Sequence, residues 1–104
     1  MNLDRLIKNI ELNDKINYDG NIDIKGISYN SNKISKGDIF VCMRGEHVDG
    51  HNFAADAVEK GAVAIMAETK LDINVPQIIV ASTEQSLAPL ADNFYQSPSK
   101  DINT

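Results

Sequence analysis

The sequence predicts an α/β fold with a mixed, partly parallel sheet flanked by helices. Two apolar runs, IFVCM at 39–43 and AVAIM at 62–66, have the length and composition of strands, and the first is typical of a strand buried on both faces. A stripe of apolar residues at helical spacing, within 51–61, separates them. Because strands that alternate with helices usually pair in parallel, we expect a partly parallel sheet after residue 38.

The amino-terminal third predicts a short helix, a loop and one strand. Residues 2–10 place apolar side chains at helical spacing, which predicts an amphipathic helix. The segment 11–21 is rich in Asn and Asp and is typical of a turn or loop. Apolar and polar residues then alternate from Ile22 to Tyr29 with a shift at Gly26, so we expect a strand with a bend or bulge there.

The middle of the chain contains clear start and stop signals. Residues 30–38 are mostly turn formers and lysines, which predicts a loop. The helix within 51–61 is expected to stop at Gly61, because glycine readily adopts the backbone conformation that ends helices. A further strand is predicted in VPQIIVA at 75–81, and Pro76 marks its entry, where a missing N–H costs least.

The last segment predicts a helix over residues 82–99. Ser82 followed three residues later by Gln85 has the spacing of a capping box, which favours a helix start at this point. Pro89 lies beyond the first turn, where proline removes a hydrogen bond and kinks the axis. We therefore expect a helix with an irregular first half.

Length, charge and composition restrict the classes of function. At 104 residues, with 42% apolar and 24% charged residues, the chain is expected to form one soluble domain. Its net charge of −5 and the lack of a basic cluster argue against nucleic acid as a partner. Neither a membrane span nor a signal peptide is recognisable, so we expect a cytoplasmic protein with no membrane partner. Cys42 lies in an apolar run and is interpreted as a small buried side chain.

Two loops are candidates for a ligand site. One follows ISY at 27–29, and the other, GEHVDGH at 45–51, follows the strand IFVCM and leads into a helix. In sheets of this kind, ligands favour the loops beyond the carboxyl ends of strands. A helix start offers free N–H groups to phosphate or carboxylate, and Ser31 in the first loop adds a hydroxyl donor.

Metal binding and acid–base catalysis are two other interpretations of GEHVDGH. His47 and His51 are four residues apart, a spacing that brings two metal ligands together only on a helix, whereas Gly50 favours a turn. A histidine base needs a nucleophile or a polarised substrate beside it, and the sequence shows no such pairing. The phosphate-loop pattern GxxxxGK[ST] is also absent, so ATP hydrolysis by this chain alone is not expected.

Several motifs in a fixed order resemble those of the Mur ligases. The stretch ISYNSNKISKGDIFVCMRGEHVDGHNFAADAVEKGAVAIMAE at 27–68 is similar to their D-S-R triplet, K-x-x-x-GD-[IL]-FV-[AC], DGH-x-F and GA-x-A, and FYQSPS at 94–99 resembles the end of their N-terminal domain. The resemblance spans residues 20–104 and is strongest to the MurE branch, UDP-N-acetylmuramoyl-tripeptide synthetase. The MurF branch shares the GD-[IL]-FV and DGH elements and stands as the alternative.

The resemblance implies a division of labour between domains. In these ligases the N-terminal domain holds the UDP part of UDP-MurNAc-L-Ala-D-Glu. ATP and magnesium belong to a central domain, and the incoming meso-diaminopimelate or L-lysine is selected largely by a C-terminal one. We therefore expect residues 1–104 to be a single N-terminal domain that packs on the central domain, with both other domains absent from this chain. No catalytic residue, cofactor or metal is expected within it, although the whole ligase forms an amide bond with ATP.

The resemblance also places five substrate-binding residues. Ser31 matches the serine of the D-S-R triplet and Tyr29 matches the residue two positions before it, so both are expected at the uridine nucleotide. Glu46, His47 and Val48 match the positions between the strand-end glycine and DG. They are expected to line the uracil or ribose, largely through backbone groups.

Two positions depart from the family pattern. Asn30 and Asn32 stand where the triplet has Asp and Arg, so an ion pair between these positions is lost and a less rigid loop is expected. Arg44 and Lys33 are the candidate cations for offsetting the diphosphate charge. A non-catalytic metal-binding or interaction module is the remaining alternative to a ligase domain.

Overall fold

A computed structural model describes residues 1–43 and 50–102, with the backbone alone described at residues 31, 50–51 and 96–102. Five strands, three α-helices and two short 3₁₀ helices (η) lie in these ranges. In chain order they are α1 (Leu3–Leu6), β1 (Asp14–Ile16), β2 (Gly26–Ser28), η1 (Ser31–Lys33), β3 (Asp38–Val41), η2 (Gly50–Phe53), α2 (Ala54–Glu59), β4 (Ala64–Ala67), β5 (Gln77–Ile79) and α3 (Thr83–Ile102).

The five strands form one mixed sheet in the order β1-β5-β4-β3-β2. Strands β2 to β5 run parallel, and β1 joins the edge of β5 in the antiparallel direction. Helix α2 connects β3 to its parallel neighbour β4, which is the expected crossover arrangement. The predicted fold class, a mixed and partly parallel sheet flanked by helices, is therefore confirmed.

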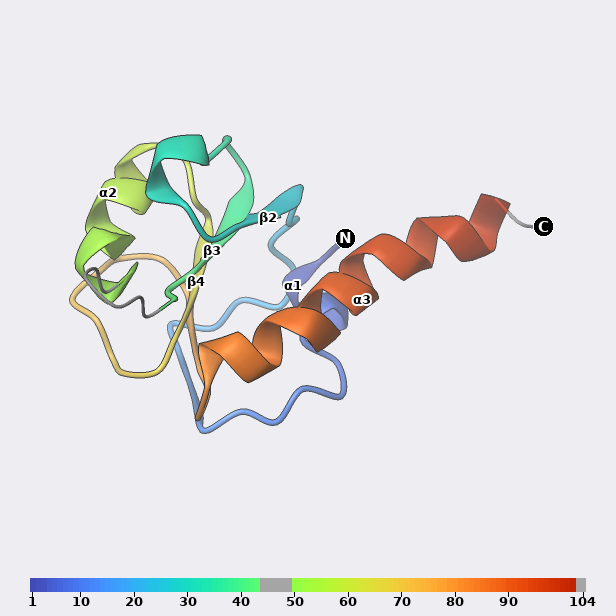
Figure 1. Ribbon diagram of the computed structural model, residues 1–104, viewed down its shortest axis with the longest axis horizontal. Coiled ribbons are helices and arrows are strands. Elements are labelled where there is room, and N and C mark those ends of the chain that lie inside the picture. Colours follow the sequence, from blue (N-terminus) through green and yellow to red (C-terminus); the bar gives the residue numbers. More distant parts are fainter. Residues whose placement is uncertain (44–49, 103–104) are drawn as a thin grey trace.

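The sheet separates two hydrophobic clusters (Figure 1). Ile39 and Val41 of β3 pack in the cluster with α1 and α3, whereas Phe40 and Cys42 pack in the other with α2. This alternation follows from the two-residue period of a strand, and it explains why a strand covered on both faces is apolar throughout. Cys42 is fully buried, as predicted from its place in the run.

The helix predicted after GEHVDGH is confirmed, with its predicted end. Ala54 and Ala57 of α2 are buried against the sheet, and Lys60 caps the helix. Gly61 follows with φ +122°, a backbone conformation that residues with a Cβ rarely adopt. Its carbonyl accepts a hydrogen bond from the Gly37 N–H at 2.9 Å, which ties the end of α2 to the chain entering β3.

The predictions for residues 2–21 need two corrections. The helix predicted at 2–10 is only Leu3–Leu6, because Asn9 takes a left-handed conformation with φ 66° soon after it. The loop predicted at 11–21 contains β1, whose exposed Asp14 and Lys15 conceal its strand character from a hydrophobicity pattern. As an edge strand, β1 depends mainly on backbone pairing with β5, and Ile16 is its one side chain packed against a hydrophobic cluster.

The strand predicted from Ile22 to Tyr29 changes partner partway along. Its first half bonds to the amino terminus, where the Leu3 N–H donates to the Ile22 carbonyl at 2.9 Å. Its second half is β2, which pairs with β3 in regular register from Gly26 opposite Asp38. Of the bend or bulge predicted at Gly26, the regular register excludes the bulge. The pattern shifts there because the chain leaves one partner and joins another.

Helix α3 is longer and more regular than predicted. It runs without interruption from Thr83 to Ile102, so the irregular first half expected from Pro89 is wrong. The Ser82 hydroxyl accepts a hydrogen bond from the Gln85 N–H at 3.2 Å, which confirms the serine half of the predicted cap. Asn93 donates to the carbonyls of Leu6 and Lys8, so α3 also closes the end of α1. The far end of α3 projects beyond the body of the domain (Figure 1).

Candidate functional site

Tyr29 and Ser31 lie in the turn that follows β2. Because β2 and β3 are parallel neighbours, with Ser28 opposite Phe40, the connections after both strands leave from the same edge of the sheet. Tyr29 is 63% exposed, and Ser31, two residues later, begins η1. The predicted loop at 30–38 thus contains a short helical turn, and its last residue, Asp38, already belongs to β3.

The turn is closed by its own asparagine and by backbone bonds. The Asn30 side chain accepts a hydrogen bond from the Asn32 N–H at 2.9 Å, and the Asn30 carbonyl accepts one from the Lys33 N–H at 2.9 Å. The Ser28 hydroxyl donates to the same carbonyl at 3.1 Å. Asn30 therefore acts as the cap of η1, because a short amide side chain can reach the N–H two residues on.

A residue at the start of α3 bonds to the chain directly after β3. The Thr83 hydroxyl donates to the Cys42 carbonyl at 2.8 Å, and the Thr83 N–H donates to the Glu68 carboxylate at 3.0 Å. Thr83 is 1% exposed, so these bonds are sheltered from water. Thr83 thus links the start of α3 to the residues that directly follow β3 and β4. The sequence pattern predicted a cap at Ser82 but did not identify this residue, whose partners come from distant parts of the chain.

Three of the five predicted site residues, Glu46, His47 and Val48, lie outside the described residues, as does the candidate cation Arg44. Lys33, the other candidate cation, is exposed on η1. His51 lies in η2, for which only the backbone is described. The metal hypothesis rests on His47 and His51. It is therefore outside what the described side chains can test.

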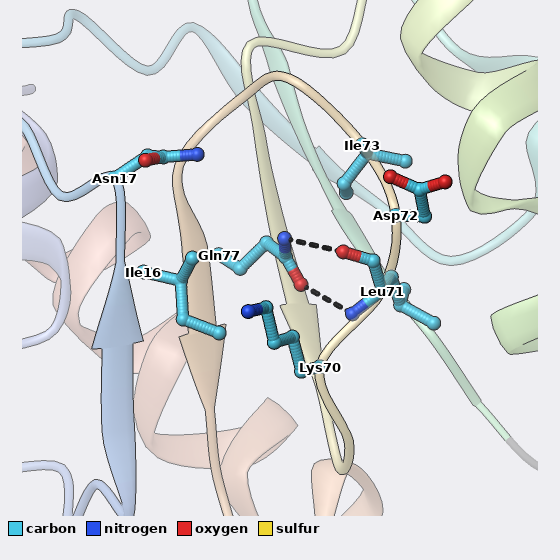
Figure 2. A pocket seen from close by; sticks show the side chains of 7 residues that line it. All are labelled: Ile16, Asn17, Lys70, Leu71, Asp72, Ile73 and Gln77. Atoms are coloured by element: carbon cyan, nitrogen blue, oxygen red, sulfur yellow. Dashed lines mark hydrogen bonds between the residues drawn. The ribbon is translucent and has the colours of Figure 1, made fainter.

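Two pockets lie elsewhere on the domain. One, of about 370 Å³, opens between the end of β1, the connection from β4 to β5, and Gln77 (Figure 2). The other, of about 250 Å³, lies between residues 9–13 and the start of α3. Neither of these two pockets is lined by Tyr29 or Ser31. We favour the turn after β2, because parallel α/β sheets place ligands beyond the carboxyl ends of their strands.

The first pocket has a fixed wall. Figure 2 shows the Gln77 side-chain amide facing the backbone of Leu71, to which it donates at 2.8 Å and from which it accepts at 2.7 Å. Gln77 is 1% exposed, and both polar ends of its side chain are satisfied by this pairing. Its role in the pocket is therefore structural.

Two searches of the described residues give negative results. Within 1–43 and 50–102, no set of three or more His, Cys, Asp or Glu side chains is arranged to hold a metal ion. Among the helices of the same ranges, none is both long and apolar enough to cross a bilayer.

The fold defines a class, the α/β domains with a mixed, mainly parallel sheet whose connections leave from the carboxyl edge of the parallel strands. Within that class, residues 23–95 match the family model described as "Mur ligase family, catalytic domain". The chain belongs to the Mur ligase family. This confirms the resemblance found in the motifs.

Curated relatives show which ligases the chain is similar to. It is 49% identical over 79 residues to the UDP-N-acetylmuramoyl-L-alanyl-D-glutamate--2,6-diaminopimelate ligase of Listeria monocytogenes, covering 76% of this chain and 16% of the relative. The ligase of the same name from Bacillus velezensis is 48% identical over 80 residues, covering 77% and 16%. These names agree with the predicted resemblance to the MurE branch. The chain spans about 16% of the length of these relatives.

Solved structures of the MurF branch share the fold. The crystal structure of MurF from Acinetobacter baumannii matches with a TM-score of 0.63 and 34% identity, covering 67% of this chain and 16% of that chain. MurF from Thermotoga maritima, solved in complex with ADP, matches with a TM-score of 0.58 and 36% identity, covering 67% and 16%. The sheet and its flanking helices are thus those of a Mur ligase domain.

Proposed function

We propose that this chain binds the UDP part of UDP-MurNAc-L-Ala-D-Glu within a ligase that adds diaminopimelate to that substrate. The carrying observation is the identity of 48–49% with ligases of that name, over about three quarters of the chain. The relatives' names favour diaminopimelate over L-lysine as the added amino acid. With this function we propose a cytoplasmic location.

The proposed site assigns binding to this domain and chemistry to the rest of the ligase. Tyr29 and Ser31 would contact the uridine from the turn after β2, and Glu46, His47 and Val48 would do so from the loop after β3. An exposed aromatic ring offers a face on which a base can stack, and a serine hydroxyl can donate to a ring or phosphate oxygen. ATP and Mg²⁺ would act in the central domain, against which this domain would pack.

The capped turn supports this assignment. A ligand-binding hydroxyl is most effective when its backbone is fixed before the ligand arrives, since less conformational entropy is then lost on binding. Bonds at Asn30 and Lys33 enclose the backbone of Ser31 on both sides. Tyr29 lies two residues before Ser31, directly after the last residue of β2.

The second candidate is the equivalent domain of a MurF ligase. The solved MurF structures favour it, because they share the fold at 34–36% identity. The higher identity to diaminopimelate ligases, 49%, keeps it second. Amide-bond formation by the whole ligase discriminates between the two when UDP-MurNAc-L-Ala-D-Glu and the corresponding tripeptide are compared as substrates, because the name of one solved relative describes a ligase of the diaminopimelate-containing precursor. Binding to this domain alone does not discriminate, since both substrates carry the same UDP part.

Ser31→Ala tests the site. If the hydroxyl donates to the nucleotide, its removal is expected to weaken binding of UDP-MurNAc-L-Ala-D-Glu about tenfold, the cost of one hydrogen bond to a charged or strongly polar acceptor. Isothermal titration calorimetry measures the change. Ser35→Ala is the matched control, since Ser35 is exposed in the same connection and bonds to Asp38 through its backbone N–H and carbonyl. Equal affinity of Ser31→Ala and the unaltered protein would remove Ser31 from the site.

A further inference from the structure

Lys60, at the end of α2, reaches across to the turn that carries Ser31. Its ammonium lies 3.1 Å from the Asp56 carboxylate, one helical turn earlier, and 3.4 Å from the Asn32 side-chain oxygen. Lys60 and Asn32 are 28 positions apart in the sequence. One ammonium therefore links α2 and η1, and the Asp56 carboxylate restricts where that ammonium can lie.

A second contact holds the same connection against the end of α2. The Gly37 N–H donates to the Gly61 carbonyl at 2.9 Å, and the missing side chain of Gly61 leaves room for the backbone of Lys36. The connection between β2 and β3 is thus attached to the end of α2 at two points. Lys60 holds Asn32 in the middle of the connection, and Gly61 holds Gly37 just before β3. The Asn30 cap fixes the fold of the turn itself, whereas these two contacts fix its place on the domain.

We propose that Lys60 is a positioning residue for nucleotide binding, acting through Asn32 to hold the Ser31 turn against α2. This inference rests on the proposed function. Lys60 is not expected to touch the nucleotide. A lysine suits the role because its long side chain spans the gap and its ammonium can donate to Asp56 and Asn32 at once.

The partial exposure of the Lys60–Asp56 ion pair allows a positioning role to be distinguished from a role in stability. The Lys60 and Asp56 side chains are 39% and 46% exposed, and ion pairs in that setting add little to the stability of a fold. A positioning role therefore predicts that loss of the ammonium weakens nucleotide binding while the unfolding midpoint stays within about 2 °C. A purely structural role predicts a lower unfolding midpoint and no specific loss of nucleotide binding.

Four variants test the proposal. Lys60→Met keeps most of the length of the side chain and removes the ammonium, and is expected to weaken binding of UDP-MurNAc-L-Ala-D-Glu by about 3–5-fold. Lys60→Arg restores a donor and is expected to recover most of the affinity. Asp56→Asn frees the ammonium and is expected to give a smaller loss. Lys8→Met is the control, because it removes the same charge from an exposed residue whose carbonyl bonds to Asn93 of α3, on the face of the sheet opposite α2.

Amide NMR spectra without ligand supply the second readout. Lys60→Met is expected to move the signals of Asn32 and Lys33, whereas Lys8→Met leaves them in place. Unchanged affinity and unchanged turn signals in Lys60→Met, with binding by the unaltered protein intact, would overturn the positioning role and leave the proposed function standing. An equal loss in Lys8→Met would also overturn it, since total charge would then explain the effect. Failure of the unaltered protein to bind would overturn both proposals.

Discussion

Gly61→Ala is expected to lower the free energy of unfolding by about 3 kcal/mol, since two costs coincide at this position. The backbone has φ +122°, where a side chain is strained whatever space surrounds it. A Cβ would also lie 2.7 Å from the Lys36 Cα, a backbone atom that cannot rotate away. Urea denaturation followed by circular dichroism measures the change, with the slope of the transition checked for constancy.

Gly37→Ala is the matched control for this prediction. Gly37 also has a positive φ, +96°, but the atoms nearest to its added Cβ belong to the flexible Lys25 side chain, at 3.0 Å or more. Its substitution should therefore cost the strain without the backbone clash, about 1–2 kcal/mol. Equal losses at the two glycines would contradict the close approach of α2 and the connection into β3.

Gln77→Leu is expected to cost about 2–3 kcal/mol, because it removes both hydrogen bonds between the buried side chain and Leu71. Leucine has a similar volume, so the loss is one of polar pairing and not of packing. The backbone N–H and carbonyl of Leu71 would lose their partners in a partly buried place. Thermal or urea unfolding reports the global cost. Faster hydrogen exchange at the Leu71 amide would show that it arises in the wall of the pocket in Figure 2.

Gln77→Glu sharpens the same prediction through its pH dependence. A carboxylate still accepts from the Leu71 N–H but cannot donate to the Leu71 carbonyl, whereas a protonated carboxyl does both. The folded-state pKa of the introduced carboxyl should therefore be raised, and the variant should regain stability as the pH falls through that pKa. A deficit that does not change with pH, or a Gln77→Leu variant as stable as the original, would contradict the described pairing.

The sequence predicts best the elements whose burial is uniform. The run IFVCM and the stripe ending at Gly61 specify β3 and α2, because a strand covered on both faces and a helix covered on one have distinct apolar periods. Strand β1 was missed, because an edge strand with exposed Asp14 and Lys15 carries no such period. Its pairing with β5 depends on the tertiary fold and cannot be predicted from the residues of β1 alone.

Long-range polar contacts are the other part that sequence patterns do not contain. Thr83 is bonded to Cys42, 41 positions away, and Lys60 is bonded to Asn32 across 28 positions. Each residue alone is typical of a helix end, so the pattern gives no reason to pair it with a particular partner. Of the five predicted site residues, Tyr29 and Ser31 lie on the turn after β2. The nucleotide role of all five stays a prediction.

The proposed division of labour is tested most directly by titrating the chain with UDP while its amide NMR signals are followed. We expect saturable shifts at Tyr29, Ser31 and residues 46–48, with little change at Asn17 and Leu71 beside the pocket of Figure 2. Inorganic pyrophosphate at the same concentration should give smaller shifts at Tyr29, since it lacks the uridine. If UDP causes no shift, or shifts only residues that line the pocket of Figure 2, the result would contradict the claim that the turn after β2 holds the substrate's nucleotide.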